Sequence, residues 1–376
     1  MQQFANQLIR QHGIYESFYI ANLGVLEQKI SEWKTHLPNV RPFYAIKCNP
    51  NHEMIKTLID HDIGFDCASK NEIKTALDLG CRPNHILFMH PFKTREDIEY
   101  AVSRDIKYTT YDSFSEMDKL KTYGPSLQCL MRLKVNNPSA RVQLGLKYGI
   151  DEYEFKEFVN YAKELNLNLV GVCYHVGSAS QDPNVFKEGM RYAANVFDFA
   201  KQKGFNMSVL DIGGGFTSEN FVETAKVIKN EIVNNSFDDP NINIFAEPGR
   251  YFASDVFTFF SPVIGVKHKT IPEYYIRDGL YGSFNCMVYD GQSPKLGYLR
   301  HPMLDPLTHN KNKESTLFGC TCDSLDSIGK FGLPHLRVHD FVVCDNFGAY
   351  TISGAKDFNG IPMSQPKIFY TKQKFE

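Results

Sequence analysis

The sequence has no run approaching the roughly 18 consecutive apolar residues that a membrane-spanning helix needs. Residues 1–20 also lack the charged segment, apolar stretch and cleavage site of a secretory signal. Neither charge sign dominates, since 41 Lys and Arg stand against 43 Asp and Glu and the pI is about 6.6. Such a balance gives no field that would collect nucleic acid or hold the protein on an anionic membrane. We expect a cytoplasmic protein with neither partner.

The number and spacing of the cysteines predict neither a disulfide framework nor a metal site. Nine cysteines is an odd number, and Cys67, Cys129 and Cys173 lie inside apolar runs, which favours free thiols in a reducing compartment. Cys320 and Cys322 form a C-x-C pair, but no second pair accompanies them, so we expect no metal.

What the sequence does contain is a regular alternation of strand and helix patterns. Two segments have apolar residues at helical spacing: Phe155, Phe158, Val159 and Ala162, then Met190, Ala193, Ala194 and Phe197 before Gly204. Eight short apolar runs predict strands, at 42–47, 63–67, 85–89, 107–111, 127–133, 169–175, 209–212 and 242–247. Eight βα units in about 250 residues predict an α/β fold with a (β/α)8 TIM-like barrel.

The pattern changes at about residue 253. Short runs at 256–260, 287–289 and 341–344 are separated by Gly, Pro and Asn turns, which predicts a second, all-β domain. The polar stretch 305–314 is expected to be a surface loop. We place the barrel at 15–252 and the β-domain at 253–376, together with part of 1–35.

Ionisable groups and glycines end several of the predicted strands, where barrels gather their chemistry. Lys47 ends the first strand, and an amine desolvated there becomes a nucleophile for an aldehyde. Three glycines follow the seventh strand, and their backbone N–H groups can converge on a phosphate: Gly213, Gly214 and Gly215. Taken singly, a surface lysine and a tight glycine turn are the simpler explanations.

The other strand ends extend the same ring of groups. Glu247 ends the eighth strand, where a carboxylate suits a protonated pyridine nitrogen, although it could equally pair with Arg250. His175 ends the sixth strand, with Ser178 close behind as a phosphate donor. The ring is completed by two further residues and by the turn after the eighth strand: Asp66, Arg132, and Gly249 with Arg250.

Eight motifs in order carry a family resemblance: PFYAIKCNP, FDCASKNEI, HVGSAS, DIGGGF, EPGRYF, DGLYGSFNCMVYD, CTCDSLD and GAYTISGAKDFNG. From about residue 15 to 365 the chain resembles the eukaryotic-type ornithine decarboxylases, within the alanine racemase-like class of pyridoxal-phosphate enzymes. The motifs are very specific for fold and cofactor and less so for substrate.

The resemblance implies a role for each matching residue in binding the cofactor. Lys47 would hold pyridoxal 5'-phosphate as a Schiff base, Glu247 would pair with the ring nitrogen and His175 would stack on the ring. Asp66 and Arg132 would lie near the imine. The phosphate contacts would be Ser178, the turn 213–215 with Gly249, Arg250 and Tyr350.

The resemblance also implies a homodimer with shared active sites. Cys322, the expected proton donor to Cα, and Asp323 would be supplied to the partner's barrel, with an ion pair between Lys147 and Asp326 across subunits. The substrate-facing residues would be Asp290, Asp323, Tyr289 and Phe358. Asp290 stands where a related viral arginine decarboxylase has Glu, which favours ornithine and putrescine as substrate and product.

The chain departs from the family pattern in three places. Ala179 and Ser180 replace the usual Gly and Cys, the glycine turn lacks the following Pro-Gly, and Gly291–Gln292 stands where a histidine is usual. Arginine or lysine decarboxylation therefore stays open, as does an inactive homologue resembling antizyme inhibitors. Racemisation is a weaker alternative, and the sequence does not decide whether an antizyme-like regulator binds.

Overall fold

The computed structural model describes residues 1–305 and 311–373, and its contacts divide the chain into two compact units. The barrel unit comprises Lys29–Tyr251, and the β-rich unit comprises Met1–Gln28 with Phe252–Glu376. Within the described residues, no helix is long and apolar enough to cross a membrane.

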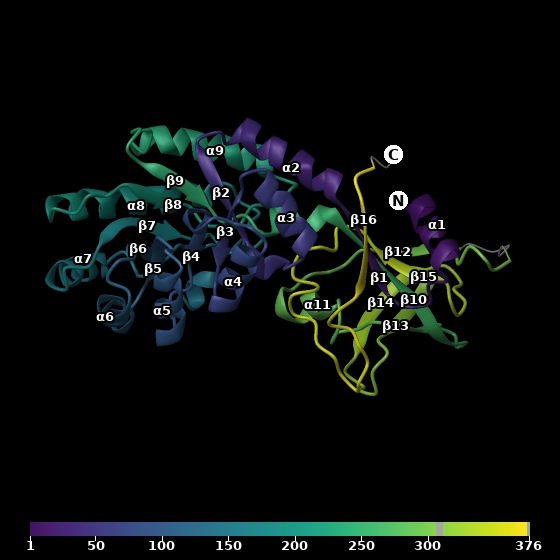
Figure 1. The fold of residues 1–376 in the computed structure, drawn as a ribbon. Coiled ribbons are helices and arrows are strands. Elements are labelled where there is room, and N and C mark those ends of the chain that lie inside the picture. Colours follow the sequence, from purple (N-terminus) through teal and green to yellow (C-terminus); the bar gives the residue numbers. More distant parts are fainter. Residues whose placement is uncertain (306–310, 374–376) are drawn as a thin grey trace. The chain divides into compact units, whose positions relative to one another are not determined.

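The barrel unit is built on eight parallel strands that close on themselves, as predicted (Figure 1). Each pairs with the next in chain order and the last returns to the first, in the order β2 (Val40–Ala45), β3 (Gly64–Cys67), β4 (Ile86–Phe88), β5 (Tyr108–Tyr111), β6 (Gln128–Leu133), β7 (Leu169–Tyr174), β8 (Val209–Asp211) and β9 (Asn243–Ala246). Their inward side chains form one apolar cluster of Phe43, Leu87, Met89, Tyr108, Leu130, Val170, Cys173, Val209 and Phe245.

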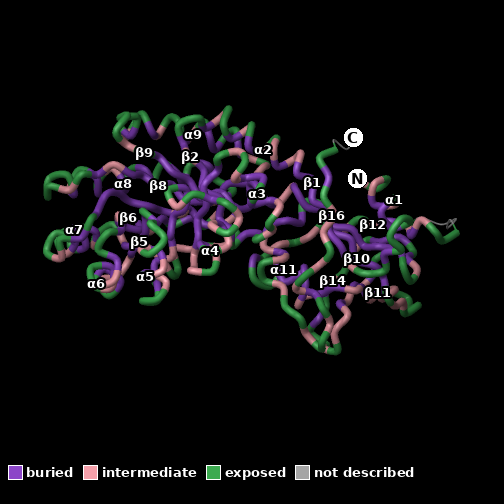
Figure 2. Tube along the Cα trace, viewed as in Figure 1, coloured by how far each residue is buried: buried purple, intermediate pink, exposed green. Residues whose placement is uncertain are grey.

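Helices separate these strands in the chain, and Figure 2 shows buried strands inside and exposed outer helix faces. α2 (Leu23–His36) precedes the first barrel strand, and the helices between the strands are α3 (His52–Asp60), α4 (Lys70–Asp78), α5 (Arg95–Ser103), α6 (Phe114–Tyr123), α7 (Phe155–Glu164), α8 (Val185–Gln202) and α9 (Phe221–Asn234). Four of them begin at a side chain that accepts a backbone N–H: Asn51, Ser69, Thr94 and Ser113. The predicted faces of α7 and α8 are buried, except for half-buried Ala194.

Lys47 corrects one detail of the prediction. β2 ends at Ala45, and Lys47 lies in a short 3-10 turn, Ile46–Cys48, rather than in the strand itself. The start of this turn is held by the segment that follows the neighbouring strand β9, because Ala45 N donates a hydrogen bond to Pro248 O at 3.4 Å. The chain therefore turns at the strand end and presents the lysine there.

The β-rich unit is an eight-stranded sheet with helices packed on it. Its main path runs β12 (Leu296–Leu299), β15 (Phe341–Cys344), β10 (Phe257–Lys267), β11 (Glu273–Ile276), β13 (Lys313–Phe318) and β14 (Ser327–Leu333). The N-terminal β1 (Phe18–Asn22) pairs antiparallel with β10 and parallel with the C-terminal β16 (Lys367–Thr371).

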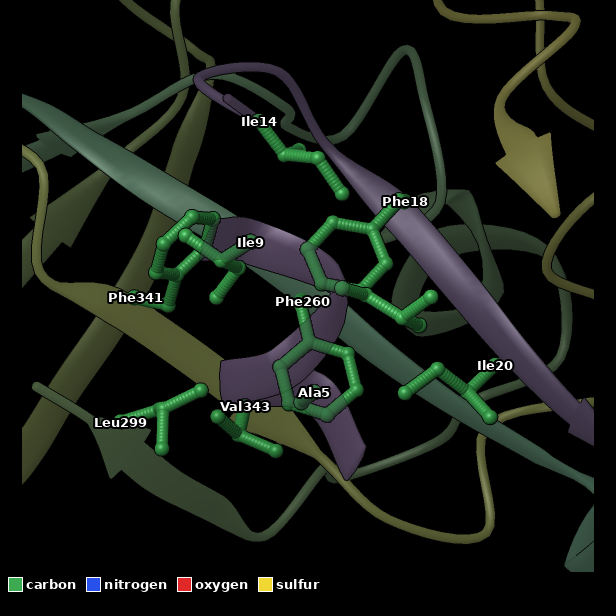
Figure 3. Packing of buried hydrophobic residues seen from close by; sticks show 10 residues of the cluster. Ala5, Ile9, Ile14, Phe18, Ile20, Phe260, Leu299, Phe341 and Val343 are labelled. Carbon is green, nitrogen blue, oxygen red and sulfur yellow. The ribbon is translucent and has the colours of Figure 1, made fainter. Parts of the chain in front are cut away.

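Figure 3 shows how the first residues enter the core of the β-rich unit. Helix α1 (Gln2–His12) buries Ala5, Leu8 and Ile9 in a cluster with Phe18 and Phe260, whose rings stack 4.8 Å apart. An apolar helix face and an apolar sheet face exclude water together, so these residues belong structurally with the C-terminal half of the chain.

Two predictions for this part of the chain need correction. The run at 287–289 is not a strand, because Asn285–Tyr289 form a short helix, α11. A hydrogen bond from Asp290 N to Cys286 O, at 3.1 Å, ends this helix. A run of three apolar residues does not distinguish the two periodicities. In the expected loop 305–314, residues 306–310 lie outside the described residues, and Lys313 and Glu314 belong to β13.

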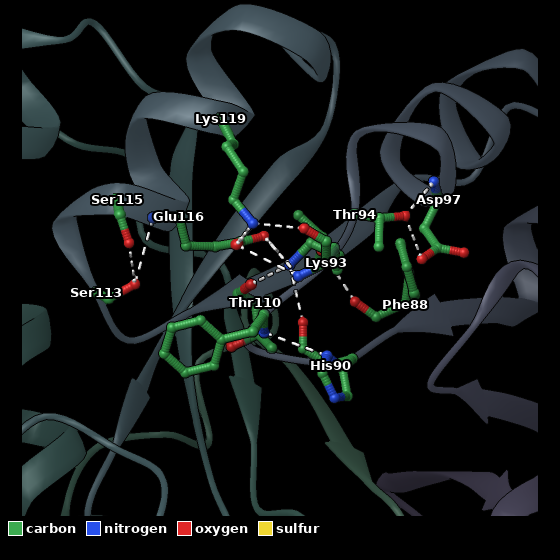
Figure 4. A network of polar contacts seen from close by, with 12 residues as sticks. Phe88, His90, Lys93, Thr94, Asp97, Thr110, Ser113, Ser115, Glu116 and Lys119 are labelled. Carbon is green, nitrogen blue, oxygen red and sulfur yellow. Dashed lines mark hydrogen bonds and ion pairs between the residues drawn. The ribbon is translucent and has the colours of Figure 1, made fainter.

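A buried ion pair supports the loop after β4 (Figure 4). The side chains of Lys93 and Glu116 are both fully buried, with Nζ 2.9 Å from Oε1, and Lys93 Nζ also donates to the carbonyls of His90 and Thr110. Burial lowers the Lys93 pKa, and Glu116 opposes this effect. Lys119, which is one-third exposed, reaches the second oxygen of Glu116.

We expect Glu116→Ala to lower the free energy of unfolding by about 3 kcal/mol, because it leaves a buried ammonium without its counter-charge. Urea denaturation of the cofactor-free protein measures this effect. Lys119→Ala is the matched control and should cost well below 1 kcal/mol, as partly exposed pairs do. Equal losses in the two variants would contradict the assignment.

Candidate functional site

Lys47 and Asp66 meet at the carboxyl ends of two neighbouring strands, β2 and β3. Lys47 Nζ contacts Asp66 Oδ2; the lysine side chain is 41% exposed and the aspartate 1%. Asp66 Oδ1 is buried and has no hydrogen-bond partner among the described residues. The pair thus provides an amine that a small molecule can reach and a buried carboxylate that holds this amine in place.

The turn 213–215 has glycine because no other residue fits it. Gly213 and Gly215 have φ of 63° and 113°, where a side chain is strained. A Cβ on Gly213 would lie 2.0 Å from Tyr174 O, and one on Gly214 would lie 2.7 Å from the His175 ring. The turn 213–215, called the glycine cradle below, therefore lies directly against the end of β7.

Ser178 and Arg250 join this cradle from two other strand ends. Arg250 Nη2 donates to Ser178 Oγ at 2.9 Å, and Arg250 is 9% exposed. Gly249 lets the chain pass close to the turn after β2, since a Cβ there would lie 2.9 Å from Cys48 Cβ. A guanidinium, a hydroxyl and glycine backbone together provide the donors that a phosphate group requires.

His175, one residue beyond β7, is neutral. Burial lowers its pKa well below the ordinary value, and the charges of Arg132 and Lys47 lower it further. Its Nδ1 accepts from Gly177 N at 3.0 Å, so the ring proton is assigned to Nε2. A neutral ring fixed in this way can lie flat against another ring without adding positive charge.

Glu247 has a close carboxyl neighbour that the sequence did not point out, Asp211 at the end of β8. Both residues are buried, and the backbone of Gly213 lies between them. Gly213 N donates to Asp211 Oδ1 at 2.8 Å, and Gly213 O accepts from Glu247 N at 2.7 Å. Asp211 Oδ2 is buried and has no hydrogen-bond partner among the described residues. Asp211 was identifiable in VLDIGGG as a charged residue in an apolar run, the same signal that identified Asp66.

These carboxyls retain protons at unusually high pH. Burial raises the pKa of Asp211 to about 7, and burial followed by the charges of Asp211 and Asp66 raises that of Glu247 well above its usual range. Arg132, 8% exposed at the end of β6, opposes both shifts. Two neighbouring buried carboxyls hold one proton more easily than two negative charges.

We expect the free energy of unfolding of the cofactor-free protein to fall as the pH rises from 3.8 to about 7, because folded Asp211 keeps a proton that the unfolded chain releases in that window. Denaturation at about pH 5 and about pH 8 tests this. Asp211→Asn should reduce the dependence, whereas Asp198→Asn on the surface of α8 should not. An unchanged slope in Asp211→Asn would refute the assignment.

The expected substrate and proton-donor residues lie in the β-rich unit. Cys322 is exposed, while seven of the other cysteines are buried and Cys320 is half-buried with a pKa raised by burial to about 11. The hydroxyl of Tyr281 donates to Asp323 Oδ2 at 2.5 Å and holds the pKa of that carboxyl below its ordinary value. Tyr281 in turn stacks on Phe358 with centroids 4.2 Å apart.

The remaining predicted residues of this unit differ in exposure. Asp290 is buried at the end of α11, whereas Tyr289 is 73% exposed. Tyr350 is half-buried with φ of 59°, an unusual backbone for a tyrosine. The contacts of these residues with substrate and phosphate stay predictions.

Asp326 and Lys147 contrast with each other. Lys147 is exposed, but Asp326 is 2% exposed and its carboxylate accepts from Leu280 N, Thr321 N and Thr321 Oγ1 at 2.8, 3.1 and 2.7 Å. Asp326 thus fixes the loop that carries Cys322 and Asp323. The intersubunit ion pair with Lys147 stays a prediction. In such a pair, Asp326 would have to contact Lys147 while it keeps these three hydrogen bonds.

Pyridoxal phosphate fits the groups at the barrel mouth. The glycine cradle with Ser178 and Arg250 suits its phosphate, the amine of Lys47 suits its aldehyde, and the buried carboxyl of Glu247 suits its ring nitrogen. Within the described residues, no cluster of three or more His, Cys, Asp or Glu side chains suits a metal ion.

Comparison with known proteins agrees with this chemistry. Residues 23–254 match the family model of the pyridoxal-dependent decarboxylase, pyridoxal binding domain. Ornithine decarboxylase of Schizosaccharomyces pombe is 36% identical over 93% of this chain and 82% of its own, and the chloroplastic enzyme of Nicotiana glutinosa 39% over 93% and 83%. Arginine decarboxylase of Paramecium bursaria Chlorella virus superposes with a TM-score of 0.94 at 33% identity, over 99% and 100% of the two chains.

Proposed function

Because this chain belongs to the pyridoxal-dependent decarboxylases, we propose that it converts L-ornithine to putrescine and CO2. The observation that supports decarboxylation is the meeting, at one barrel end, of the Lys47 amine, the buried Glu247 carboxyl and the glycine cradle. The preference for ornithine is supported by the two ornithine decarboxylases similar along 93% of the chain, and by Asp at position 290.

The side chains have distinct tasks in this reaction. When bound, pyridoxal phosphate supplies an electron-deficient ring that accepts the electron pair left at Cα as CO2 departs. Lys47 would hold the cofactor aldehyde, with Asp66 orienting the amine. Glu247 would pass its retained proton to the ring nitrogen and then, as a carboxylate, accept the ring N–H, and neutral His175 would exclude water from one ring face.

The last task is to return a proton to Cα. Cys322 is the thiol that is exposed and therefore available for that role, and Asp323 beside it would bind the distal ammonium of the substrate. Tyr281 holds Asp323 in place and favours its charged form, as recognition of a cation requires.

Substrate identity is tested by incubating the purified holoenzyme separately with ornithine, arginine and lysine and measuring CO2 and amine together. Putrescine should exceed agmatine and cadaverine by about 100-fold in kcat/KM, because a pocket sized for one chain length rejects longer ones. If agmatine is the main product, this enzyme prefers arginine, the substrate named for its viral structural relative. No product with cofactor bound would indicate the regulatory homologue.

We propose that the active enzyme is a homodimer, with Cys322 and Asp323 completing the barrel site of the partner. Apolar side chains beside the loops concerned support this proposal: Leu146, next to Lys147, is 88% exposed, and Leu325, next to Asp326, is 77% exposed. Large apolar side chains exposed on functional loops are typical of a surface that a partner covers.

Mixing two inactive variants tests the dimer. Lys47→Ala and Cys322→Ala should each be inactive, but an equal mixture allowed to exchange subunits should recover about a quarter of wild-type activity, since half the dimers then have one intact site. Cys320→Ala is the matched thiol control and should stay active. No recovery, despite subunit exchange shown by mass spectrometry, would argue against shared sites.

A cytoplasmic location is part of the same proposal. All nine cysteines are free thiols, which suits a reducing compartment. Fractionation of cells that express the protein tests the location.

A further inference from the structure

The loop that carries Ser178 has an uncommon backbone. Ala179, directly after the phosphate-binding candidate Ser178, has φ of 52°, in the left-handed region that favours glycine. Ala179 is buried, and glycine is usual here in the family that the chain resembles. An alanine keeps such a conformation only when its surroundings hold the loop on both sides.

Asn137, from the segment after β6, supplies one side of that support. It is 6% exposed, and its Nδ2 donates to Val176 O at 2.7 Å and to Ser180 Oγ at 2.9 Å. Its Oδ1 accepts from both the backbone N and the hydroxyl of Ser139, at 3.0 and 2.7 Å. One buried amide thus holds the chain before and after Ser178.

Ser180 supplies the other side and connects the loop to the glycine turn. It is 3% exposed, its backbone N donates to Gly215 O at 3.1 Å, and its own C=O accepts from Asn220 Nδ2 at 3.1 Å. The backbone N of Ser178 donates a hydrogen bond to Val142 O at 2.9 Å. The segments after β6, β7 and β8 are therefore joined at Ser180.

We propose that Asn137 and Ser180 are positioning residues that assemble the Ser178 loop and the turn 213–215 into a cup for the phosphate of the cofactor. This inference rests on the proposed function, which assigns the phosphate to that cradle. Neither residue would touch the phosphate. They act by holding the donors in place before the cofactor arrives, which reduces the entropy lost on binding.

Equilibrium titration of cofactor-free protein with two ligands tests the proposal. Pyridoxal phosphate and pyridoxal both offer the aldehyde and ring, but only the first has a phosphate. Asn137→Ala should raise Kd for pyridoxal phosphate about tenfold, the usual effect of losing a buried hydrogen bond. The Kd for pyridoxal should change by less than about twofold.

Two further variants keep the result interpretable. Asn195→Ala on α8 removes a surface amide, whose Nδ2 donates to Glu152 Oε1 at 3.0 Å, and it should change neither Kd. If Asn137→Ala does not fold, Ser180→Ala takes its place, with an effect in the same direction and smaller, because its backbone link to Gly215 survives.

The difference between the ligands decides the outcome. Weakening of both ligands by the same factor would mean general loosening of the barrel and would overturn the proposal, as would no change for either. The wild-type product assay is independent of this comparison. A wild-type enzyme that makes another amine would overturn the ornithine assignment and leave the phosphate cup standing.

Discussion

Lys47→Ala is expected to lower kcat/KM for decarboxylation by about 10⁴-fold or more, because it removes the amine that we propose captures the cofactor covalently. Asp66 would then lie buried without its counter-charge, so the affinity for the cofactor should fall as well. Steady-state CO2 release measures the first effect and absorbance titration the second.

Borohydride reduction followed by peptide mass spectrometry should locate the cofactor on Lys47 in the wild-type protein. Lys70→Ala provides the control, since Lys70 is a surface lysine whose Nζ lies 3.5 Å from Glu96. It should retain full activity. Label on another lysine, or a Lys47→Ala variant within about tenfold of wild type, would contradict the assignment.

Glu247→Ala should reduce kcat by about 10³-fold, because no carboxylate would then keep the ring nitrogen protonated as charge builds up in the ring. Glu247→Gln should lose nearly as much, since an amide of the same shape cannot stabilise a pyridinium ion. Single-turnover CO2 release with saturating cofactor measures the chemical step without the binding defect.

Glu223→Ala is the matched control, because Glu223 is an exposed glutamate on α9. It should leave kcat unchanged. A Glu247→Gln variant with near wild-type kcat would show that the hydrogen bond, rather than the charge, is what the reaction needs.

Where the molecule repeats a short local pattern, the sequence predicted the fold correctly. All eight barrel strands lie where apolar runs of four to seven residues predicted them, and the buried face of α7 is the predicted one. Both patterns depend on residues two to four positions apart, whose side chains share a face whatever the rest of the chain does. At residues 287–289 the run was too short to show its period, and the prediction was wrong.

The candidate residues of the barrel were also identifiable from sequence, because several ionisable groups end successive predicted strands and those ends meet at one face of a barrel. The partners of these residues were not. Asp211 and Glu247 are 36 positions apart, and Asn137 and Ser180 are 43 apart. No periodic pattern extends over such separations.

The sequence by itself therefore determined the positions of the barrel strands, the outline of the barrel and the residue types at its mouth, since local periodicity and chain order encode them. Only the tertiary structure decided that Asp211 shares the environment of Glu247, that Asn137 supports Ser178, and that Tyr281 holds Asp323. Those contacts form when the barrel closes and the sheet packs, and burial then sets their pKa values and their hydrogen bonds.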